Sequence, residues 1–422
     1  MRNIIKHILP SILAMLLLSS CADTTLPRST PEENAVTHTT PEASWNYRDL
    51  AAAAKNPTGK ASDEHFAESL TDFSEALFKK CAVRGENLIL SPLSLTYALT
   101  LTSNGAHGDT LCEFESLNGG ISTAEMNEYL FWNALTLAST KESKVKVANS
   151  LWTDDGFPVN SQFKWIAEKY YNADAVSADF TSDAMVDELN AWVSERTDGM
   201  IDTVMDTPPA DLVMLIVNTV LFDGKWETPY GENMVSEGIF TNYDGTEAQA
   251  ELMYSHEAAY FTGDGYSGFS KPYTDGYRFI ALLPEEGTDI YNFADNIDWS
   301  DAIEKALDGN LESADCYLPK FEADWEMGLN EILMDMGLKK AFTADAELDG
   351  LSETGSGLFI SSVRQKAVIT VNESGTKAAA YSEVAVDECE HPMIRLNRPF
   401  AYAIVDSETG IPLFLGILAD MK

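Results

Sequence analysis

Basic residues are scarce in this chain of 422 residues, and their scarcity excludes two large classes of function. Only 28 lysines and arginines stand against 67 aspartates and glutamates, which leaves a formal net charge of −39 at pH 7. A surface this acidic repels the phosphates of nucleic acids and of anionic lipids. We therefore expect no nucleic-acid partner and no electrostatic docking to membranes, while the charge itself favours a soluble globular protein.

Catalytic and metal-binding motifs are also missing. The sequence holds no G-x-S-x-G nucleophile elbow, no G-x-x-x-x-G-K-[ST] phosphate loop and no H-E-x-x-H metal motif. Its six histidines are scattered, and its five cysteines show no C-x-x-C spacing. We expect a protein that is not an enzyme and that uses no cofactor or metal ion. Four cysteines remain available for disulfides, in three pairings that the sequence leaves open: Cys81, Cys112, Cys316 and Cys389.

The N-terminal apolar run is too short to cross a membrane. Residues 8–18 form an interrupted run of 11 that follows the basic residues Arg2 and Lys6, whereas a membrane-spanning helix needs about 20 apolar residues. Such a segment is typical of an export signal. It ends in Leu-Ser-Ser-Cys at residues 18–21, which resembles the lipobox of bacterial lipoproteins.

The lipobox resemblance implies how the mature protein is attached to a membrane. In that family the cysteine, here Cys21, is acylated and the chain is cut just before it, so that the acyl chains hold the protein in a lipid bilayer. We therefore expect an exported bacterial lipoprotein on the periplasmic or the cell-surface side of a membrane. An ordinary cleaved signal peptide with a chance cysteine is the alternative.

The composition changes after Cys21. Residues 22–44 are rich in Thr, Pro and Glu, and Leu26 and Val36 are their only sizeable apolar side chains. Such a segment cannot bury enough apolar surface to offset its ordering entropy, so we expect a disordered tether. Residues 45–61 are ambiguous and fit one short helix. The predicted organisation is a signal peptide at 1–20, a lipid-anchored tether at 21–60 and one folded domain at 61–422.

The folded part alternates between helical and strand-like patterns without a repeat. Apolar residues recur at intervals of 4, 3 and 4 over residues 66–77, which predicts a helix that Ser62 caps. Continuous or short apolar runs predict strands at 212–222, 278–283, 366–371, 400–405 and 411–418. Helices crowd the first half and strands the second. Because regular βαβ alternation is absent, we expect the α+β class.

One segment carries two patterns at once. From residue 376 to 386, every second side chain is small or branched and uncharged, as in a half-buried strand. The alanines of this segment, the glycine before it and the acidic residues after it are instead typical of an exposed loop. An ordinary sheet strand would explain the first pattern alone. A loop that becomes a strand explains both.

With these features in hand, the chain resembles the serpin family from Asp63 to its C-terminus, over about 360 residues. The resemblance rests on several motifs in the family's order. These are residues 87–94 (NLILSPLS), 104–106 (NGA), 189–193 (LNAWV), 197–199 (TDG), 217–226 (VNTVLFDGKW), 318–321 (LPKF), 373–380 (ESGTKAAA), 396–400 (LNRPF) and 412–416 (PLFLG).

The resemblance implies a fold and an activity. Serpins have about nine helices around three β-sheets and present an exposed reactive-centre loop as bait. A serine or cysteine protease cuts the bait, and the freed loop enters the main sheet and traps the acyl-enzyme. We therefore expect a monomeric protease inhibitor that is a suicide substrate. The alternative is a non-inhibitory lipoprotein of the same fold that acts as a binding module.

The resemblance also assigns roles to individual residues. The loop hinge matches Glu373, Gly375, Thr376, Ala378, Ala379 and Ala380, and the small side chains there favour inhibition. The buried polar cluster that gates sheet opening matches Ser91, Ser94 and Asn218, with Gln365 in place of the usual histidine. Trp226 and Lys320 match residues at the insertion point, where Lys320 would pair with Glu373.

The family's usual loop length places the reactive bond between Cys389 and Glu390. The return to the next strand is about one residue shorter than common, so the bonds after Glu388 and after Val386 are alternatives. No basic residue lies between Lys377 and Arg395, which argues against a trypsin-like target. An elastase-like or papain-like protease fits the small thiol better, and a Glu-cutting enzyme is a further possibility.

Overall fold

The computed structural model describes residues 59–138, 144–197, 199, 201–207, 212–355, 357–375 and 391–421, all within one compact unit. Its described part contains nine α-helices, six of them before residue 200. They are α2 (Glu64–Cys81), α3 (Pro92–Ser103), α4 (Gly108–Leu117), α5 (Thr123–Ala138), α6 (Ser161–Tyr171), α7 (Asp183–Arg196), α8 (Ile290–Asn296), α9 (Trp299–Leu307) and α10 (Asn330–Asp335).

Helix α2 confirms the helix predicted over residues 66–77, but its N-cap residue differs from the predicted Ser62. The carboxylate of Asp63 accepts the backbone N–H of Phe66 at 3.0 Å, and Asp63 is the N-cap residue in place of Ser62. A carboxylate can satisfy a free amide at a helix start as well as a serine hydroxyl can. Helix α3 follows with Ser91 as its cap and Pro92 at its first position, and all twelve of its residues are buried. It is the central helix of the fold.

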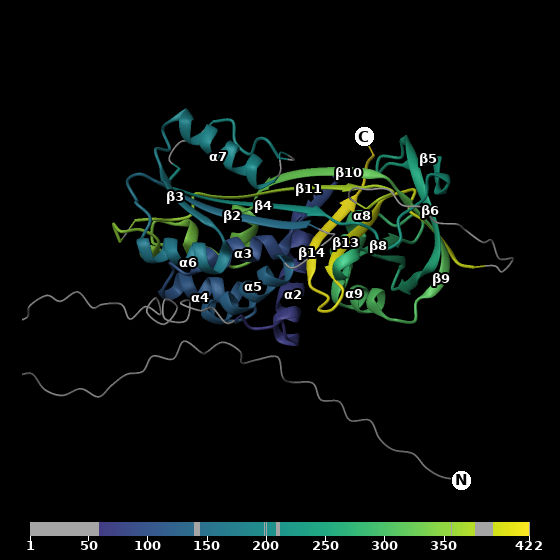
Figure 1. The fold of residues 1–422 in the computed structure, drawn as a ribbon, viewed down its shortest axis with the longest axis horizontal. Helices are drawn as coiled ribbons and strands as arrows, with labels where there is room; N and C mark the ends of the chain where they lie inside the picture. Colours follow the sequence, from purple (N-terminus) through teal and green to yellow (C-terminus); the bar gives the residue numbers. More distant parts are fainter. Residues whose placement is uncertain are drawn as a thin grey trace, which may run out of the picture. The chain divides into compact units, whose positions relative to one another are not determined.

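Five strands form the first sheet, in the order β10 (Phe321–Gly328), β11 (Ser362–Val371), β4 (Met214–Asp223), β2 (Lys144–Asp154) and β3 (Asp174–Ala178). Helix α7 covers one face of this sheet, and helices α3 to α6 lie on the other side (Figure 1). Under α7, the apolar residues Met185, Leu189 and Val193 pack on Leu215 and Val217 of β4. The expected strands at 212–222 and 366–371 are therefore β4 and β11 of this covered sheet.

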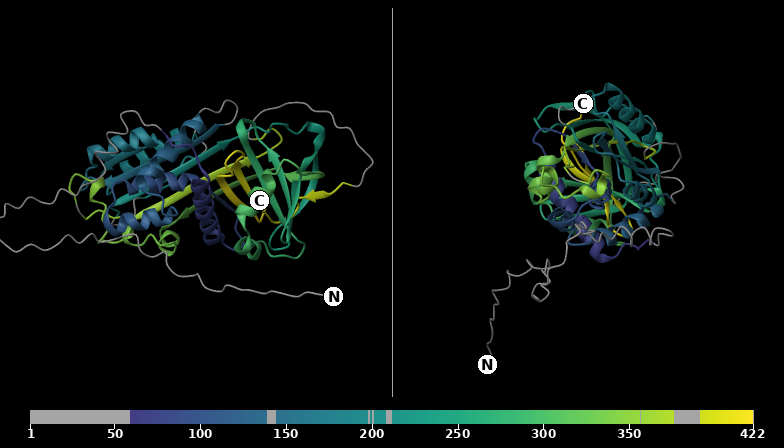
Figure 2. Two further views of the ribbon diagram at one scale, coloured as in Figure 1. Left: turned by 90° about the horizontal axis from the view of Figure 1, so that it is seen from below. Right: turned by 90° about the vertical axis from the view of Figure 1, so that its left-hand side faces the viewer.

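The second sheet is nine-stranded, and it gathers at the other end of the body from helices α3 to α6 (Figure 2). Its main path runs β1 (Leu88–Leu90), β14 (Pro412–Leu418), β13 (Phe400–Asp406), β8 (Tyr277–Pro284), β7 (Tyr266–Pro272), β6 (Glu247–Gly263), β9 (Glu312–Pro319) and β12 (Met393–Arg395), and β5 (Val235–Thr241) pairs with β6. The remaining predicted strands are found here as β8, β13 and β14.

The hydrogen bonding joins the described strands into two sheets, where the family resemblance implies three. The reason is the length of β6, which spans 17 residues. Its first part pairs with β5, its last residues pair with β7, and β9 runs along its other edge. Strand β6 thus pairs with two groups of strands at once. It joins into one nine-stranded sheet what would otherwise be two separate sheets.

The described cysteines exclude the disulfide pairings considered above. Cys81 and Cys316 carry free, buried thiols, and burial raises the pKa of Cys81 to about 12. Each of the three pairings considered above needs all four cysteines, so none of them is formed here. Among the described residues, no helix has both the length and the apolar character needed to cross a bilayer.

Candidate functional site at the seam between β4 and β11

Strands β4 and β11 lie side by side and run parallel, in a register that pairs Ser362 with Leu215 at one end and Val368 with Leu221 at the other. The neighbouring pairs, β10 with β11 and β2 with β4, are antiparallel. At the seam between β4 and β11, as between the parallel strands β2 and β3 at the sheet edge, one additional strand can run antiparallel to both of its neighbours. The residues that hold this seam shut define the candidate site.

Four residues that the sequence singled out meet at the seam. Gln365 and Asn218 are register partners, and Gln365 Nε2 donates to Asn218 Oδ1 at 2.9 Å. Gln365 Nε2 also donates to the carbonyl of Ser91 at 2.9 Å, and its Oε1 accepts the N–H of Ser91 at 3.0 Å. Asn218 Nδ2 donates to the carbonyl of Ser94 at 2.8 Å and to its hydroxyl. Two strands are thus pinned to the start of helix α3.

A fifth member of this cluster was missed by sequence reasoning. Asn149 of β2 lies opposite Asn218, and its Oδ1 accepts a hydrogen bond from Asn218 Nδ2 at 2.6 Å. All five side chains are buried. The available signal was the pair of consecutive polar residues Asn149 and Ser150 inside a strand-like stretch, which no motif marks. The cluster therefore spans three strands and one helix.

The chain reverses direction directly after β11. Residues 372–375 form a turn in which Asn372 and Gly375 exchange backbone hydrogen bonds. Trp226 makes two hydrogen bonds to this turn. Its backbone N–H donates to the carbonyl of Ser374 at 3.2 Å, and its indole Nε1 donates to the carbonyl of Asn372 at 2.8 Å. The N–H of Tyr230 adds a bond of 2.9 Å to the carbonyl of Glu373. The loop therefore starts at a fixed point above the seam.

Gly375 is required by this geometry. Its φ of +102° lies in the left-handed region, and a Cβ on it would come within 2.3 Å of the carbonyl oxygen of Gly224. The predicted hinge glycine thus packs against the segment that leads to Trp226.

An ion pair adds a second contact at the loop start. Lys320 Nζ lies 2.9 Å from Glu373 and 3.3 Å from Glu251. The hydrogen bond from Lys320 is the main cause that lowers the pKa of Glu373. Partial burial lowers the pKa of Lys320, but the two carboxylates outweigh it and the pKa is raised overall. The pairing of Lys320 with Glu373 that the resemblance implies is present.

Beneath Trp226 lies a buried cation that sequence reasoning also missed. The Trp226 ring stacks on Tyr273 with centroids 4.1 Å apart. Lys271 is buried, pairs with Glu257 at 2.7 Å and places its Nζ 4.5 Å from the centroid of the Tyr230 ring. Because a buried charge must be paired, these contacts fix Trp226 and Tyr230 in position.

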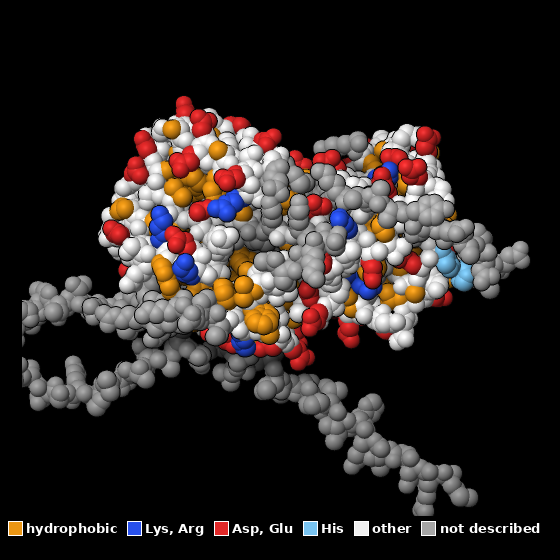
Figure 3. All heavy atoms as spheres, in the orientation of Figure 1, with side chains coloured by type: hydrophobic (Ala, Val, Ile, Leu, Met, Phe, Trp, Pro, Cys, Tyr) orange, Lys and Arg blue, Asp and Glu red, His pale blue; other side chains and the backbone are white. Residues whose placement is uncertain are grey.

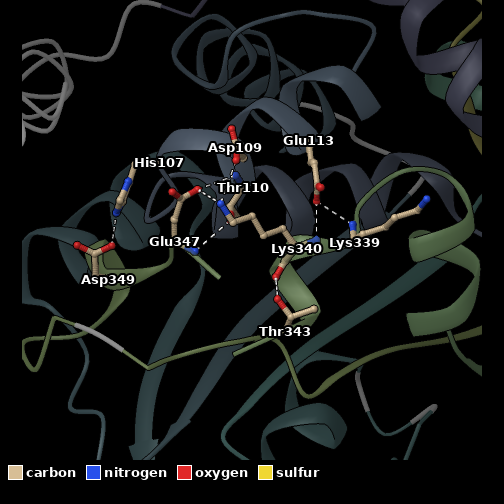
Figure 4. A network of polar contacts seen from close by, with 9 residues as sticks. All are labelled: His107, Asp109, Thr110, Glu113, Lys339, Lys340, Thr343, Glu347 and Asp349. Carbon is tan, nitrogen blue, oxygen red and sulfur yellow. Dashed lines mark hydrogen bonds and ion pairs between the residues drawn. The ribbon is translucent and has the colours of Figure 1, made fainter. Parts of the chain in front are cut away.

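The segment that leads into β11 is fixed by a polar network at helix α4 (Figure 4). The carboxylate of Glu113 accepts the backbone N–H groups of Lys339 and Lys340, both at 2.7 Å. Lys340 Nζ lies 2.9 Å from Glu347, whose carboxylate also accepts the N–H of Thr110 at 3.1 Å. Any movement of β11 away from β4 therefore starts from an anchored segment.

Several predicted site residues lie outside the described residues, so the structure does not place them. They are Cys21, the hinge residues Thr376, Ala378, Ala379 and Ala380, and the reactive-bond candidates Val386, Glu388, Cys389 and Glu390. The chain is described again from His391, which precedes β12. Within the described ranges, no group of three or more His, Cys, Asp or Glu residues is placed to hold a metal ion.

Comparison with known proteins agrees with this geometry. The family model described as Serpin (serine protease inhibitor) matches residues 68–421, so the chain belongs to the serpin family. Human neuroserpin is 27% identical over 376 residues, which cover 83% of this chain and 90% of neuroserpin. Crystal structures of the thermophilic serpin tengpin, 34% identical, match in its native state with a TM-score of 0.79 (87% of this chain, 98% of tengpin) and in its latent state with 0.76 (86% and 100%).

Proposed function

We propose that this serpin inhibits a protease as a suicide substrate, and that its cut loop enters the seam between β4 and β11. The observation that carries the proposal is the turn at residues 372–375, which reverses the chain at the end of β11. A segment that continues from Gly375 over the seam runs antiparallel to β11. Because β4 is parallel to β11, the same segment is antiparallel to β4 and can pair with both strands.

The side chains of the loop suit this slot. The alternate residues that would face inward are all uncharged: Thr376, Ala378, Ala380, Ser382, Val384 and Val386. A charged side chain on that face would lose its hydration without a partner, at a cost of several kcal/mol. Lys377, Glu383 and Asp387 fall on the other face, where charge is tolerated.

Insertion exchanges one strand pairing for two. The ladder between β4 and β11 and the hydrogen bond between Gln365 and Asn218 must break first. Afterwards the loop pairs with both strands, and each added ladder hydrogen bond contributes about 1 kcal/mol net. The uncut form is then a kinetic trap whose useful stability is the height of a barrier. Serpin loop insertion is itself an established example of strand addition.

The target we propose is a protease with an elastase-like or papain-like preference. The reactive bond is proposed between Cys389 and Glu390, with the bonds after Glu388 and Val386 as alternatives. Support comes from the absence of any basic residue between Lys377 and Arg395. The inhibitor would act at a membrane surface, because we also propose that Cys21 is acylated after export and that the chain works as an anchored monomer.

Incubation with a panel of proteases tests the inhibitory function. The purified protein is mixed with elastase-like, trypsin-like and Glu-specific serine proteases and with a papain-like protease, and the products are separated on denaturing gels. An inhibitor forms a covalent adduct of about the summed mass with at least one serine protease. Clipped protein without an adduct, under all conditions, would favour the non-inhibitory binding module.

A further inference from the structure

Helix α5 presents an apolar face at the surface. Trp132 and Leu135 lie three residues apart, so they are neighbours on the helix surface, and they are 44% and 51% exposed. Hydrophobic side chains interrupt the polar surface over α5 and its neighbouring helices (Figure 3). Adjacent large apolar side chains of this kind mark contact surfaces more often than scattered single ones do.

The first described residues of the chain are fastened to the same helix. The N–H of Lys60 donates to the carbonyl of Glu128 at 3.1 Å, and Lys60 Nζ donates to Glu125 Oε1 at 2.7 Å. Gly59 packs directly on the backbone of Trp132, since a Cβ on Gly59 would come within 2.9 Å of the Trp132 Cα. The tether predicted for residues 21–60 is therefore already docked at its C-terminal end.

These contacts give the chain a direction along α5. From Lys60 beside Glu128 to Gly59 beside Trp132, the chain moves toward the C-terminal end of the helix. Leu135 is three residues further on, which is about 4.5 Å along the helix axis. An extended chain covers about 3.3 Å per residue, so two residues before Gly59 would be enough to span the distance to Leu135.

A cleft of about 560 Å³ lies behind Leu135. Its lining is largely apolar and aromatic and includes Tyr97, Phe131, Leu135 and Tyr170. Asn149 also lines it and is only 2% exposed, and its Nδ2 has no hydrogen-bond partner within the described part of the chain. An unpaired buried amide calls for an acceptor, and a peptide carbonyl entering the cleft would supply one.

We propose that residues 45–58 (WNYRDLAAAAKNPT) cover the face of α5 and enter this cleft. The segment carries Leu50 and the four alanines 51–54 as apolar material. Each of its residues, Pro57 included, has a backbone carbonyl that could accept a hydrogen bond from Asn149. Its Arg48 and Asp49 suit the opposite charges of Glu195 and Lys169, which also line the cleft. A second copy is a poorer occupant, because each copy carries a net charge of −39.

The docked segment would also affect how easily the five-stranded sheet opens. Asn149 belongs to the cleft and also accepts the hydrogen bond from Asn218 at the seam. An occupied cleft therefore holds β2 in place beside β4 and opposes opening of the five-stranded sheet. The docking itself does not depend on the proposed inhibitory function.

Hydrogen exchange on the full chain in detergent micelles tests the proposal. Leu50→Asp places a charge in the docking segment, and Leu26→Asp is the matched control in the tether. We expect the amides of residues 123–138 to exchange about tenfold faster in Leu50→Asp, from the loss of one buried leucine, and at the wild-type rate in the control.

A double substitution separates docking from a local effect on the helix. Leu135→Asp should raise exchange in the same peptide, and adding Leu50→Asp to it should change nothing further, because both remove one contact. Wild-type exchange in Leu50→Asp, or additive effects of the two substitutions, overturns the proposal. Protection that depends on protein concentration, or that arises only with added lipid vesicles, assigns the face to a second copy or to lipid and also overturns it.

Discussion

Gln365 of β11 donates a hydrogen bond of 2.9 Å to Asn218 of β4 directly across the seam of the five-stranded sheet. Both side chains are buried, and each is also bonded to the start of α3, through Ser91 and Ser94 respectively. A strand that enters between β4 and β11 must break the bond between the two amides. In the proposed mechanism, this one side-chain pair would therefore set part of the height of the barrier to insertion.

Replacing Gln365 by Ala should lower that barrier. The substitution leaves the N–H of Ser91 and the Oδ1 of Asn218 without these partners, which destabilises the closed sheet by about 1–3 kcal/mol. We expect a lower denaturation midpoint and a shorter half-life of inhibitory activity at 37 °C. Gln365→His, the residue that the family resemblance places there, is the control and should lose less. Equal half-lives for Gln365→Ala and the wild type would contradict the gating role.

Thr376→Arg should convert the inhibitor into a substrate. In the proposed mechanism, residue 376 is the first side chain to enter the sheet, and a buried guanidinium without a partner would stop insertion there. The variant should still be cut but should form no covalent adduct on a denaturing gel. Lys377→Arg is the matched control, because residue 377 falls on the outward face, and it should form the adduct normally. An adduct with Thr376→Arg refutes insertion from this end of the loop.

The contact of Lys320 with Glu373 should give a small pH dependence. The pKa of Glu373 is lowered in the folded protein, so its stabilising contribution is present above the ordinary pKa of about 4.5 and is lost as the pH falls through the folded value. The side chain of Glu373 is 41% exposed, and we expect no more than about 1 kcal/mol from the pair.

Urea unfolding as a function of pH measures this contribution. Glu373→Gln should be less stable than the wild type at pH 7, and the two curves should converge once the pH falls below the lowered pKa of Glu373. Glu322→Gln, at an exposed position on β10, should follow the wild type throughout. A difference for Glu373→Gln that persists at low pH points to a cause other than the ion pair.

Gly375→Ala should destabilise the native turn through a steric clash. A methyl group there would lie 2.3 Å from the carbonyl of Gly224, whereas Gly85, with φ of +81°, has open space around it. Gly85→Ala therefore carries only the conformational cost of about 1 kcal/mol, and Gly375→Ala should lose clearly more in free energy of unfolding. Equal losses would mean that the turn relaxes without cost.

The proposed anchor is tested by Cys21→Ser. Without the thiol no acyl chain can be attached, and the chain's net charge of −39 disfavours any electrostatic membrane binding. The variant should move from the membrane fraction to the soluble fraction after cell fractionation. A variant that stays with the membranes shows that Cys21 is not the anchor.

Sequence reasoning succeeded where the signal is local or carried by an ordered motif. Apolar runs located β4 and β11, and family motifs brought Ser91, Ser94, Asn218 and Gln365 together, as the structure has them. Sequence reasoning missed residues whose roles become visible only from their neighbours in the folded structure. Asn149 and Lys271 are polar side chains whose partners lie at least 14 residues away in the chain, and no periodicity marks such contacts.

Two further differences have similar causes. The cap of α2 moved from Ser62 to Asp63 because both residue types cap helices and only the backbone geometry decides between them. The merging of two strand arrays depends on the 17-residue length of β6, which includes stretches that do not alternate cleanly between polar and apolar.

The thermal melt of the protein before and after a single cut within residues 386–390 tests the central claim most directly. If the cut loop enters the seam, roughly ten added ladder hydrogen bonds at about 1 kcal/mol each stabilise the sheet, and the melting temperature should rise by at least about 10 °C. An unchanged or lower melting temperature after complete cleavage would contradict insertion and with it the inhibitory mechanism.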